Sequence, residues 1–172
     1  GPKAVDDILI TAELGTIDGT GGVLGQAGPT SIRTDGYLPA TAVMKFDIAD
    51  ATTFNQLGLF DDIVLHEMSH SLGFGSIWSY LGLVSDGLYT GADAVAAYHD
   101  VLQGQLAGIP VEQDGGSGTA GSHWDEDTFG NELMTGYINN ANAFSAMSAA
   151  SFGDLGYVLS SDWLSFTDGY TI

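Results

Sequence analysis

The segment His66-Glu67-Met68-Ser69-His70 lies in a stretch of helical periodicity, and this feature constrains the fold more than any other. Apolar residues recur there three and four positions apart, the spacing of one face of an α-helix: Leu57, Phe60, Val64, Met68 and Leu72. Thr53 and Gln56 resemble a capping box, and Gly73 and Gly75 are typical of a helix end. We therefore predict one helix from about Thr53 to Leu72, with both histidines near its end.

The rest of the sequence predicts strands, loops and two further helices. Val5 to Leu14 is rich in β-branched and apolar residues, and Pro39 to Phe46 alternates as a half-buried strand does. We expect the second strand near a sheet edge, where it could pair with an extended peptide. Helical spacing is present near Ala92 to Leu106 and over Ser145 to Leu155, and the glycine-rich segment Glu112 to Ser122 is a predicted loop. The predicted fold class is α+β.

Length and composition exclude several classes of protein. A chain of 172 residues fits one domain, and no apolar run is long enough to span a membrane. The formal charge of −19 argues against nucleic acid as a partner, because nucleic acid is bound through clustered Lys and Arg. There is no cysteine, so any metal must be held by His, Asp or Glu.

Residues four apart on a helix lie on one face, so His66 and His70 can direct imidazole nitrogens at one metal ion. Glu67 is placed to accept a proton from water beside such an ion. A catalytic zinc ion needs a third protein ligand. The compact form of the motif would place a histidine at position 76, which is Ser76 here. The sequence alone leaves His99 and His123 as candidates.

Three segments together resemble the leishmanolysin family of metzincin peptidases. They are His-Glu-Met-Ser-His-Ser-Leu-Gly-Phe-Gly-Ser-Ile-Trp at 66–78, Gly-Ser-His-Trp-Asp-Glu at 121–126 and Glu-Leu-Met-Thr-Gly-Tyr at 132–137. The resemblance runs from about Val5 to Tyr157. It implies a metzincin or zincin-like fold: a twisted mixed sheet, an active-site helix and a small C-terminal subdomain.

The resemblance also implies a function and a set of site residues. His66, His70 and His123 are the implied ligands of one catalytic Zn²⁺ ion, Glu67 is the implied general base, and Met134 is the methionine of the turn beneath the metal. The implied activity is that of a zinc endopeptidase acting on peptides or proteins outside the cytoplasm or at the cell surface. The implied domain is a single catalytic one covering residues 1–172, with an upper part at about 3–75 and an insertion and lower part at about 76–172.

Departures from the family limit the comparison. The parasite surface enzymes that name the family are rich in disulfides, whereas this chain has none, so we expect a compact, bacterial relative. Tyr137 stands one position later than a tyrosine that assists catalysis in some metzincins, and we assign it no role. Asp125 to Gly136 lacks the glutamate at position twelve of an EF-hand calcium loop, although another structural Ca²⁺ site stays open.

Two other functions are compatible with the same motif. One is a catalytically silent, zinc-containing adhesion or interaction module, and the other is a zinc amidase with a non-protein substrate. Glu67 argues against the first, because a purely structural metal site needs no general base. Gly1-Pro2 resembles the remnant of an engineered cleavage, so we expect targeting and pro-segments to lie upstream. The sequence does not indicate an oligomeric state.

Overall fold

The computed structural model describes residues 7–172 and divides the chain into two compact units, Gly1–Ser76 and Ile77–Ile172. The first unit contains a three-stranded sheet and two helices, and the second contains shorter helices around a small sheet. The mixture confirms the predicted α+β composition. Gly1-Pro2 and the expected start of the first strand at Val5 lie outside the described residues. Over residues 7–172, every helix is too short or too polar to cross a membrane.

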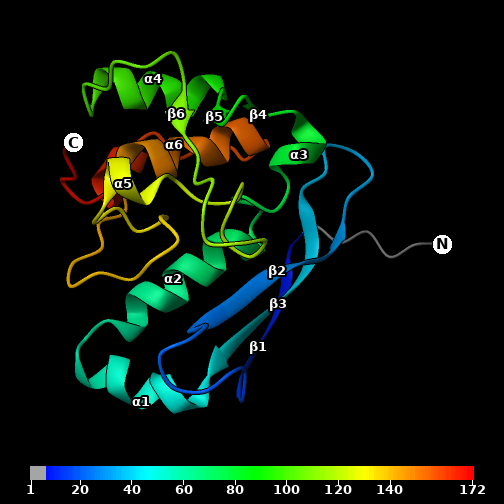
Figure 1. The fold of residues 1–172 in the computed structure, drawn as a ribbon. Helices are drawn as coiled ribbons and strands as arrows, with labels where there is room; N and C mark the ends of the chain where they lie inside the picture. Colours follow the sequence, from blue (N-terminus) through cyan, green and yellow to red (C-terminus); the bar gives the residue numbers. More distant parts are fainter. Residues whose placement is uncertain (1–6) are drawn as a thin grey trace. The chain divides into compact units, whose positions relative to one another are not determined.

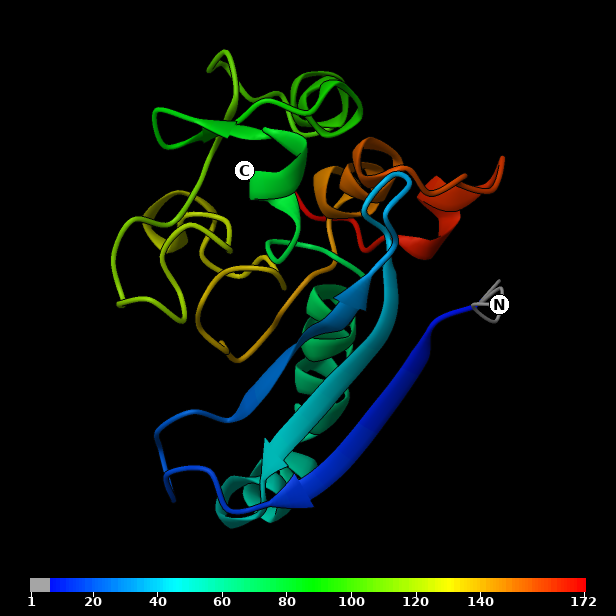
Figure 2. The same cartoon turned by 90° about the vertical axis from the view of Figure 1, so that its right-hand side faces the viewer.

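The sheet of the first unit is mixed, with the strand order β1-β3-β2 (Figure 2). Strand β1 (Leu9–Gly15) runs parallel to β3 (Pro39–Asp47), and β2 (Gly25–Ile32) runs antiparallel to it. The strand predicted at Pro39 to Phe46 is therefore confirmed, but its expected place near a sheet edge is wrong. Its backbone is paired on both sides, and β1 and β2 are the two edge strands of this sheet.

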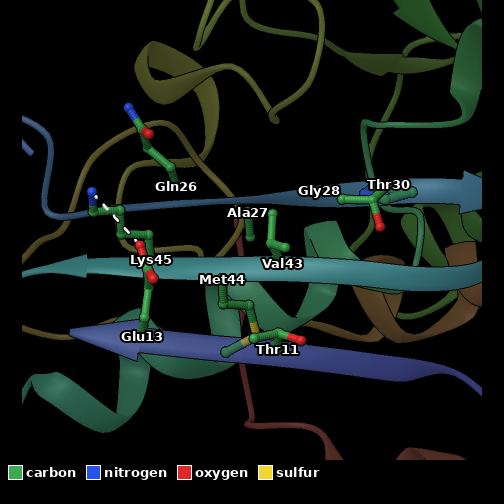
Figure 3. A pocket seen from close by; sticks show the side chains of 10 residues that line it. Thr11, Glu13, Gln26, Ala27, Gly28, Thr30, Val43, Met44 and Lys45 are labelled. Carbon is green, nitrogen blue, oxygen red and sulfur yellow. Dashed lines mark ion pairs between the residues drawn. The ribbon is translucent and has the colours of Figure 1, made fainter. Parts of the chain in front are cut away.

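The two faces of this sheet differ in burial. On β3 the side chains of Ala42, Met44 and Phe46 are buried, whereas Val43 between them is 47% exposed. The buried face carries helix α2, which lies behind the strands in Figure 2. The other face is open and forms a shallow hollow of about 460 Å³, in which Lys45 pairs with Glu13 at 3.7 Å (Figure 3).

Two helices stand where the sequence predicted one. Helix α1 (Ile48–Gln56) begins at Asp47, whose carboxylate accepts a hydrogen bond from the Ala49 N–H at 2.8 Å. The chain then turns at Gly58, which has φ of 73°, and α2 (Phe60–Ser71) follows. The predicted capping box is wrong, because Thr53 lies inside α1 and the cap is Asp47. The predicted stop is confirmed by Gly73, with φ of 117°.

Asp47 also holds the loop between β1 and β2. Its Oδ2 atom accepts hydrogen bonds from three successive backbone N–H groups, those of Ile17, Asp18 and Gly19, at 2.9 to 3.0 Å. A carboxylate surrounded by donors is stabilised in its charged form. These bonds lower the pKa of Asp47 from 3.8 to about 2, with the bond from Gly19 contributing most. One side chain thus caps α1 and orders a glycine-rich loop.

The second unit begins with α3 (Trp78–Leu81) and a small sheet of β4 (Val84–Ser85), β5 (Leu88–Tyr89) and β6 (Ile109–Pro110). Helix α4 (Ala92–Asp100) ends six residues before the predicted Leu106, and Gln103 beyond it has φ of 63°. Helix α5 (Glu126–Phe129) and a 3₁₀ turn (Trp163–Phe166) are short. Helix α6 (Ala146–Leu155) confirms the last predicted helix, with Ser145 as its N-cap.

The core of the second unit is aromatic. The rings of Trp78 and Trp124 stack with centroids 5.2 Å apart, and Tyr89 packs edge-on against both. Helix α4 packs against α6, and the two lie side by side in Figure 1. Asp154 joins them by accepting hydrogen bonds from the N–H groups of Asp93 and Ala94. The segment Glu112 to Ser122 contains no helix or strand, as predicted for a loop.

Candidate metal centre

Helix α2 brings the two histidines of the pentapeptide together. The Nε2 atoms of His66 and His70 lie 3.0 Å apart, and the ring centroids lie 4.7 Å apart. Two ligand nitrogens about 2.05 Å from a tetrahedral zinc ion would be separated by roughly 3.3 Å. The pair therefore has the spacing of two ligands that share one ion, as the sequence spacing predicts.

The chain beyond α2 fixes the tautomer of His70. Its Nδ1 atom lies 2.9 Å from the carbonyl oxygen of Phe74, which can only accept a hydrogen bond. The Nδ1 atom therefore carries the proton, and the lone pair of Nε2 is directed toward His66. Metal-binding histidines are commonly oriented in this way by a carbonyl behind the ring. The turn through Gly73 and Gly75 makes the contact possible by folding Phe74 back beside the ring.

Glu67 is buried between α2 and the start of β2. Its side chain is 6% exposed, and desolvation raises the pKa of its carboxyl from 4.5 to about 8. The closest approach is at Gly25, where an added Cβ atom would stand 2.7 Å from Oε1 of Glu67 and 2.8 Å from its Cγ. Glycine at the first position of β2 therefore leaves the space that Glu67 occupies.

The predicted apolar stripe of α2 is wrong in part. Met68 is 38% exposed and Leu57, outside the helix, is 64% exposed. The buried positions include Ile63, Glu67 and His70, so polar site residues occupy much of the buried face.

His123 belongs to the second unit and follows the loop Glu112 to Ser122. It is 6% exposed, and its Nδ1 atom lies 2.9 Å from the carbonyl oxygen of Thr119. This contact again places the proton on Nδ1 and leaves the lone pair on Nε2. Burial lowers the pKa of His123, which favours the neutral imidazole that a metal requires.

The rival ligand His99 has a different environment. It is exposed on α4, and its Nε2 atom lies 2.7 Å from the carbonyl oxygen of Leu106. Met134, by contrast, is fully buried, and its backbone carbonyl accepts a hydrogen bond from the N–H of Trp124 at 3.0 Å. Met134 is thus tied to the residue that follows His123.

Comparison with known proteins supports the resemblance seen in the sequence. The family model described as leishmanolysin, a peptidase family, matches residues 89–164. Leishmanolysin of Leishmania donovani is 31% identical over 156 residues, which cover 83% of this chain and 26% of that protein. The chain is therefore similar to the leishmanolysin family over most of its length. A leishmanolysin homolog of Crithidia fasciculata is 28% identical over 170 residues, which cover 91% of this chain and 25% of that protein.

The matches cover only part of each relative. The chain spans about a quarter of the length of the leishmanolysins it matches. In addition, these relatives come from Leishmania and Crithidia and give no support to the bacterial origin expected above.

Sequence reasoning missed two residues beside the site. Gly25 contacts Glu67 across 42 positions of chain, and Glu132 is a fully buried carboxylate two residues before Met134. No local pattern distinguishes either residue. Only the nearness of Glu132 to Met134 could have drawn attention to it.

Proposed function

We propose that this chain is the catalytic region of a zinc-dependent endopeptidase of the metzincin type. The observation that carries the proposal is the placement of Glu67, a buried carboxyl next in sequence to His66, whose Nε2 atom lies 3.0 Å from that of His70. A carboxylate beside a pair of metal-ligating histidines is placed to act as a general base. The similarity to leishmanolysins agrees with this chemistry.

The proposed zinc ligands are His66, His70 and His123. Each offers one ring nitrogen, and His70 and His123 are buried. Both of these rings have Nδ1 against a backbone carbonyl, so both present Nε2 as a neutral donor. Three imidazoles match the preference of zinc for nitrogen ligands in a catalytic site with one open position. The residues therefore fit the ion that the family implies.

In the proposed reaction, bound zinc supplies Lewis-acid polarisation of the scissile carbonyl and of water. Glu67 accepts a proton from the attacking water and passes it to the nitrogen of the leaving amine, so that the peptide bond is replaced by a carboxylate and an amine.

We propose β2 as the strand that a substrate would meet. β3 is paired on both sides, whereas β2 is an edge strand that begins at Gly25, beside Glu67. An extended peptide that adds to such an edge would form main-chain hydrogen bonds and present its backbone to the base. This mode favours unfolded segments and loops as substrates. We further propose that the protein acts outside the cytoplasm or at the cell surface.

The experiment combines metal analysis with cleavage of a mixed peptide library. The purified chain should contain about one zinc ion and cut peptides, and Glu67→Gln should keep the zinc while turnover falls by about 10²- to 10⁴-fold. Glu13→Gln is the matched control, because Glu13 lies on the open face of the sheet. Zinc without cleavage in the parent would favour an adhesion module, and cleavage of other amides alone would favour an amidase.

A further inference from the structure

Glu132 is a buried acidic residue that the proposed reaction does not use. It is 0% exposed, and both carboxylate oxygens accept hydrogen bonds. Oε1 accepts from the backbone N–H of Ser145 at 3.1 Å, from its hydroxyl at 2.6 Å and from the hydroxyl of Ser148 at 2.5 Å. Oε2 accepts from the backbone N–H of Met134. A buried carboxylate is tolerated only when donors surround it in this way.

These bonds form part of a closed ring. The hydroxyl of Ser148 donates to Glu132 and accepts a hydrogen bond from Nε1 of Trp124 at 2.8 Å. The backbone N–H of Trp124 donates to the carbonyl of Met134 at 3.0 Å, and the N–H of Met134 donates back to Glu132. The ring thus passes through Glu132, Ser148, Trp124 and Met134. Each bond constrains the next, and buried networks of this kind rigidify a core.

The ring holds the backbone on the C-terminal side of His123. Trp124 is fixed through both its backbone and its indole, and it is 0% exposed. On the other side, the His123 ring is held by the carbonyl of Thr119. The His123 imidazole is therefore restrained on one side by the carbonyl of Thr119 and on the other by Trp124, and the position of Trp124 depends on Glu132.

We propose that Glu132 is a positioning residue that fixes Met134 and Trp124 and thereby sets the position of the His123 imidazole. The inference rests on the proposed function only in treating His123 as a zinc ligand. Glu132 acts through the ring rather than by touching metal or substrate. Groups behind metal ligands commonly change metal affinity by about 10- to 100-fold when they are altered.

Replacement of Glu132 by Gln tests the need for two acceptors. If the amide oxygen takes the place of Oε1, the NH₂ group faces the N–H of Met134; if the amide is flipped, the NH₂ group faces the N–H of Ser145. In either orientation the NH₂ group of the glutamine faces a backbone N–H, so two hydrogen-bond donors face each other. The glutamine side chain has the same size and shape as the glutamate. Asp154→Asn is the matched control, because Asp154 also accepts from two backbone N–H groups and a hydroxyl, that of Tyr89.

The first readout is hydrogen exchange in the metal-free protein. In Glu132→Gln we expect the backbone N–H of Met134 and the indole N–H of Trp124 to exchange about tenfold faster or more, since hydrogen bonds to charged groups are the strong ones. Asp154→Asn should leave both exchange rates unchanged. The second readout is zinc affinity, measured by chelator competition well below the unfolding temperature of each variant, where we expect about 10- to 100-fold weaker binding in Glu132→Gln alone.

Parent-like exchange at both groups in Glu132→Gln would overturn the inference, and so would faster exchange with zinc affinity within about twofold of the parent. If Glu132→Gln does not fold, Ser148→Ala tests the same inference. It removes only the hydroxyl that links the Trp124 indole to the Glu132 carboxylate. It should speed indole exchange and weaken zinc binding, and a parent-like result would refute the inference. A parent chain that binds no zinc would refute the proposed function, while the exchange rates would still decide whether Glu132 fixes the ring.

Discussion

Gly25→Ala separates the position of Glu67 from the stability of the fold. The added Cβ atom would stand 2.7 Å from Oε1 of Glu67, against about 3.4 Å for ordinary contact, so the carboxylate must move by roughly 0.7 Å. The clashing atoms, which also include Cγ at 2.8 Å and Cδ at 3.0 Å, all belong to the Glu67 side chain, so that side chain rather than the strand backbone must shift. Alanine also restricts the unfolded chain more than glycine does. We therefore expect the free energy of unfolding to change by less than about 1 kcal/mol.

The expected effect on catalysis is much larger. A displacement of about 1 Å in a catalytic group can cost about 100-fold in rate, so we expect kcat to fall by about 10- to 100-fold with zinc content unchanged. The assay is steady-state cleavage of a fluorogenic peptide, together with thermal unfolding. Gly28→Ala is the control, because it lies on the same strand and an added Cβ atom meets nothing within 4 Å. A Gly25→Ala enzyme whose kcat matches that of Gly28→Ala would refute the reasoning.

Three further predictions concern the ligands and the loop at Asp47. His123→Ala should lose zinc, by metal analysis, whereas His99→Ala should keep it; the opposite pattern would exclude His123 as the ligand. The carboxylate of Asp47 has a folded pKa of about 2 against 3.8 unfolded, so it stabilises the fold above pH 4 and this contribution is lost between about pH 4 and pH 2. Asp47→Asn should flatten that part of the stability profile in chemical unfolding, and an unchanged profile would contradict the assignment. Chelation of the metal should abolish peptide cleavage and added zinc should restore it.

Local patterns predicted the parts of the fold that depend on neighbouring residues. The spacing of His66 and His70 indicated a helix and a ligand pair, and both are present. The strand at Pro39 to Phe46 and the helix at Ser145 to Leu155 were also predicted correctly. These features need only the period of a helix or a strand, which the sequence displays directly.

What the sequence did not reveal depends on contacts between distant segments. Strand β2 carries Gly25, Gly28 and Pro29, which weaken any strand pattern, and its partner β3 stabilises it nonetheless. The central place of β3 follows from pairing with two strands, which no single segment encodes. The break at Gly58 was hidden because apolar spacing continues across it.

The same reason applies to the site. Burial raises the pKa of Glu67, and burial is a property of the packed chain. The role inferred for Glu132 depends on Ser145 and Ser148, more than ten positions away. The type and spacing of the residues predicted the candidate ligands, but the sequence could not show which groups orient those ligands.

The contact between Nδ1 of His70 and the carbonyl of Phe74 bears on attempts to transplant this motif. A designer who copied only His-Glu-x-x-His onto another helix would obtain two imidazoles whose rings are free to rotate and to exchange tautomers. The graft would have to include residues 71–76, with the two left-handed glycines that return the chain to the ring. Because the contact is made by the backbone, the side chain at position 74 could be redesigned to suit the new host. The unit that can be transferred is therefore the helix together with the segment 71–76 that follows it.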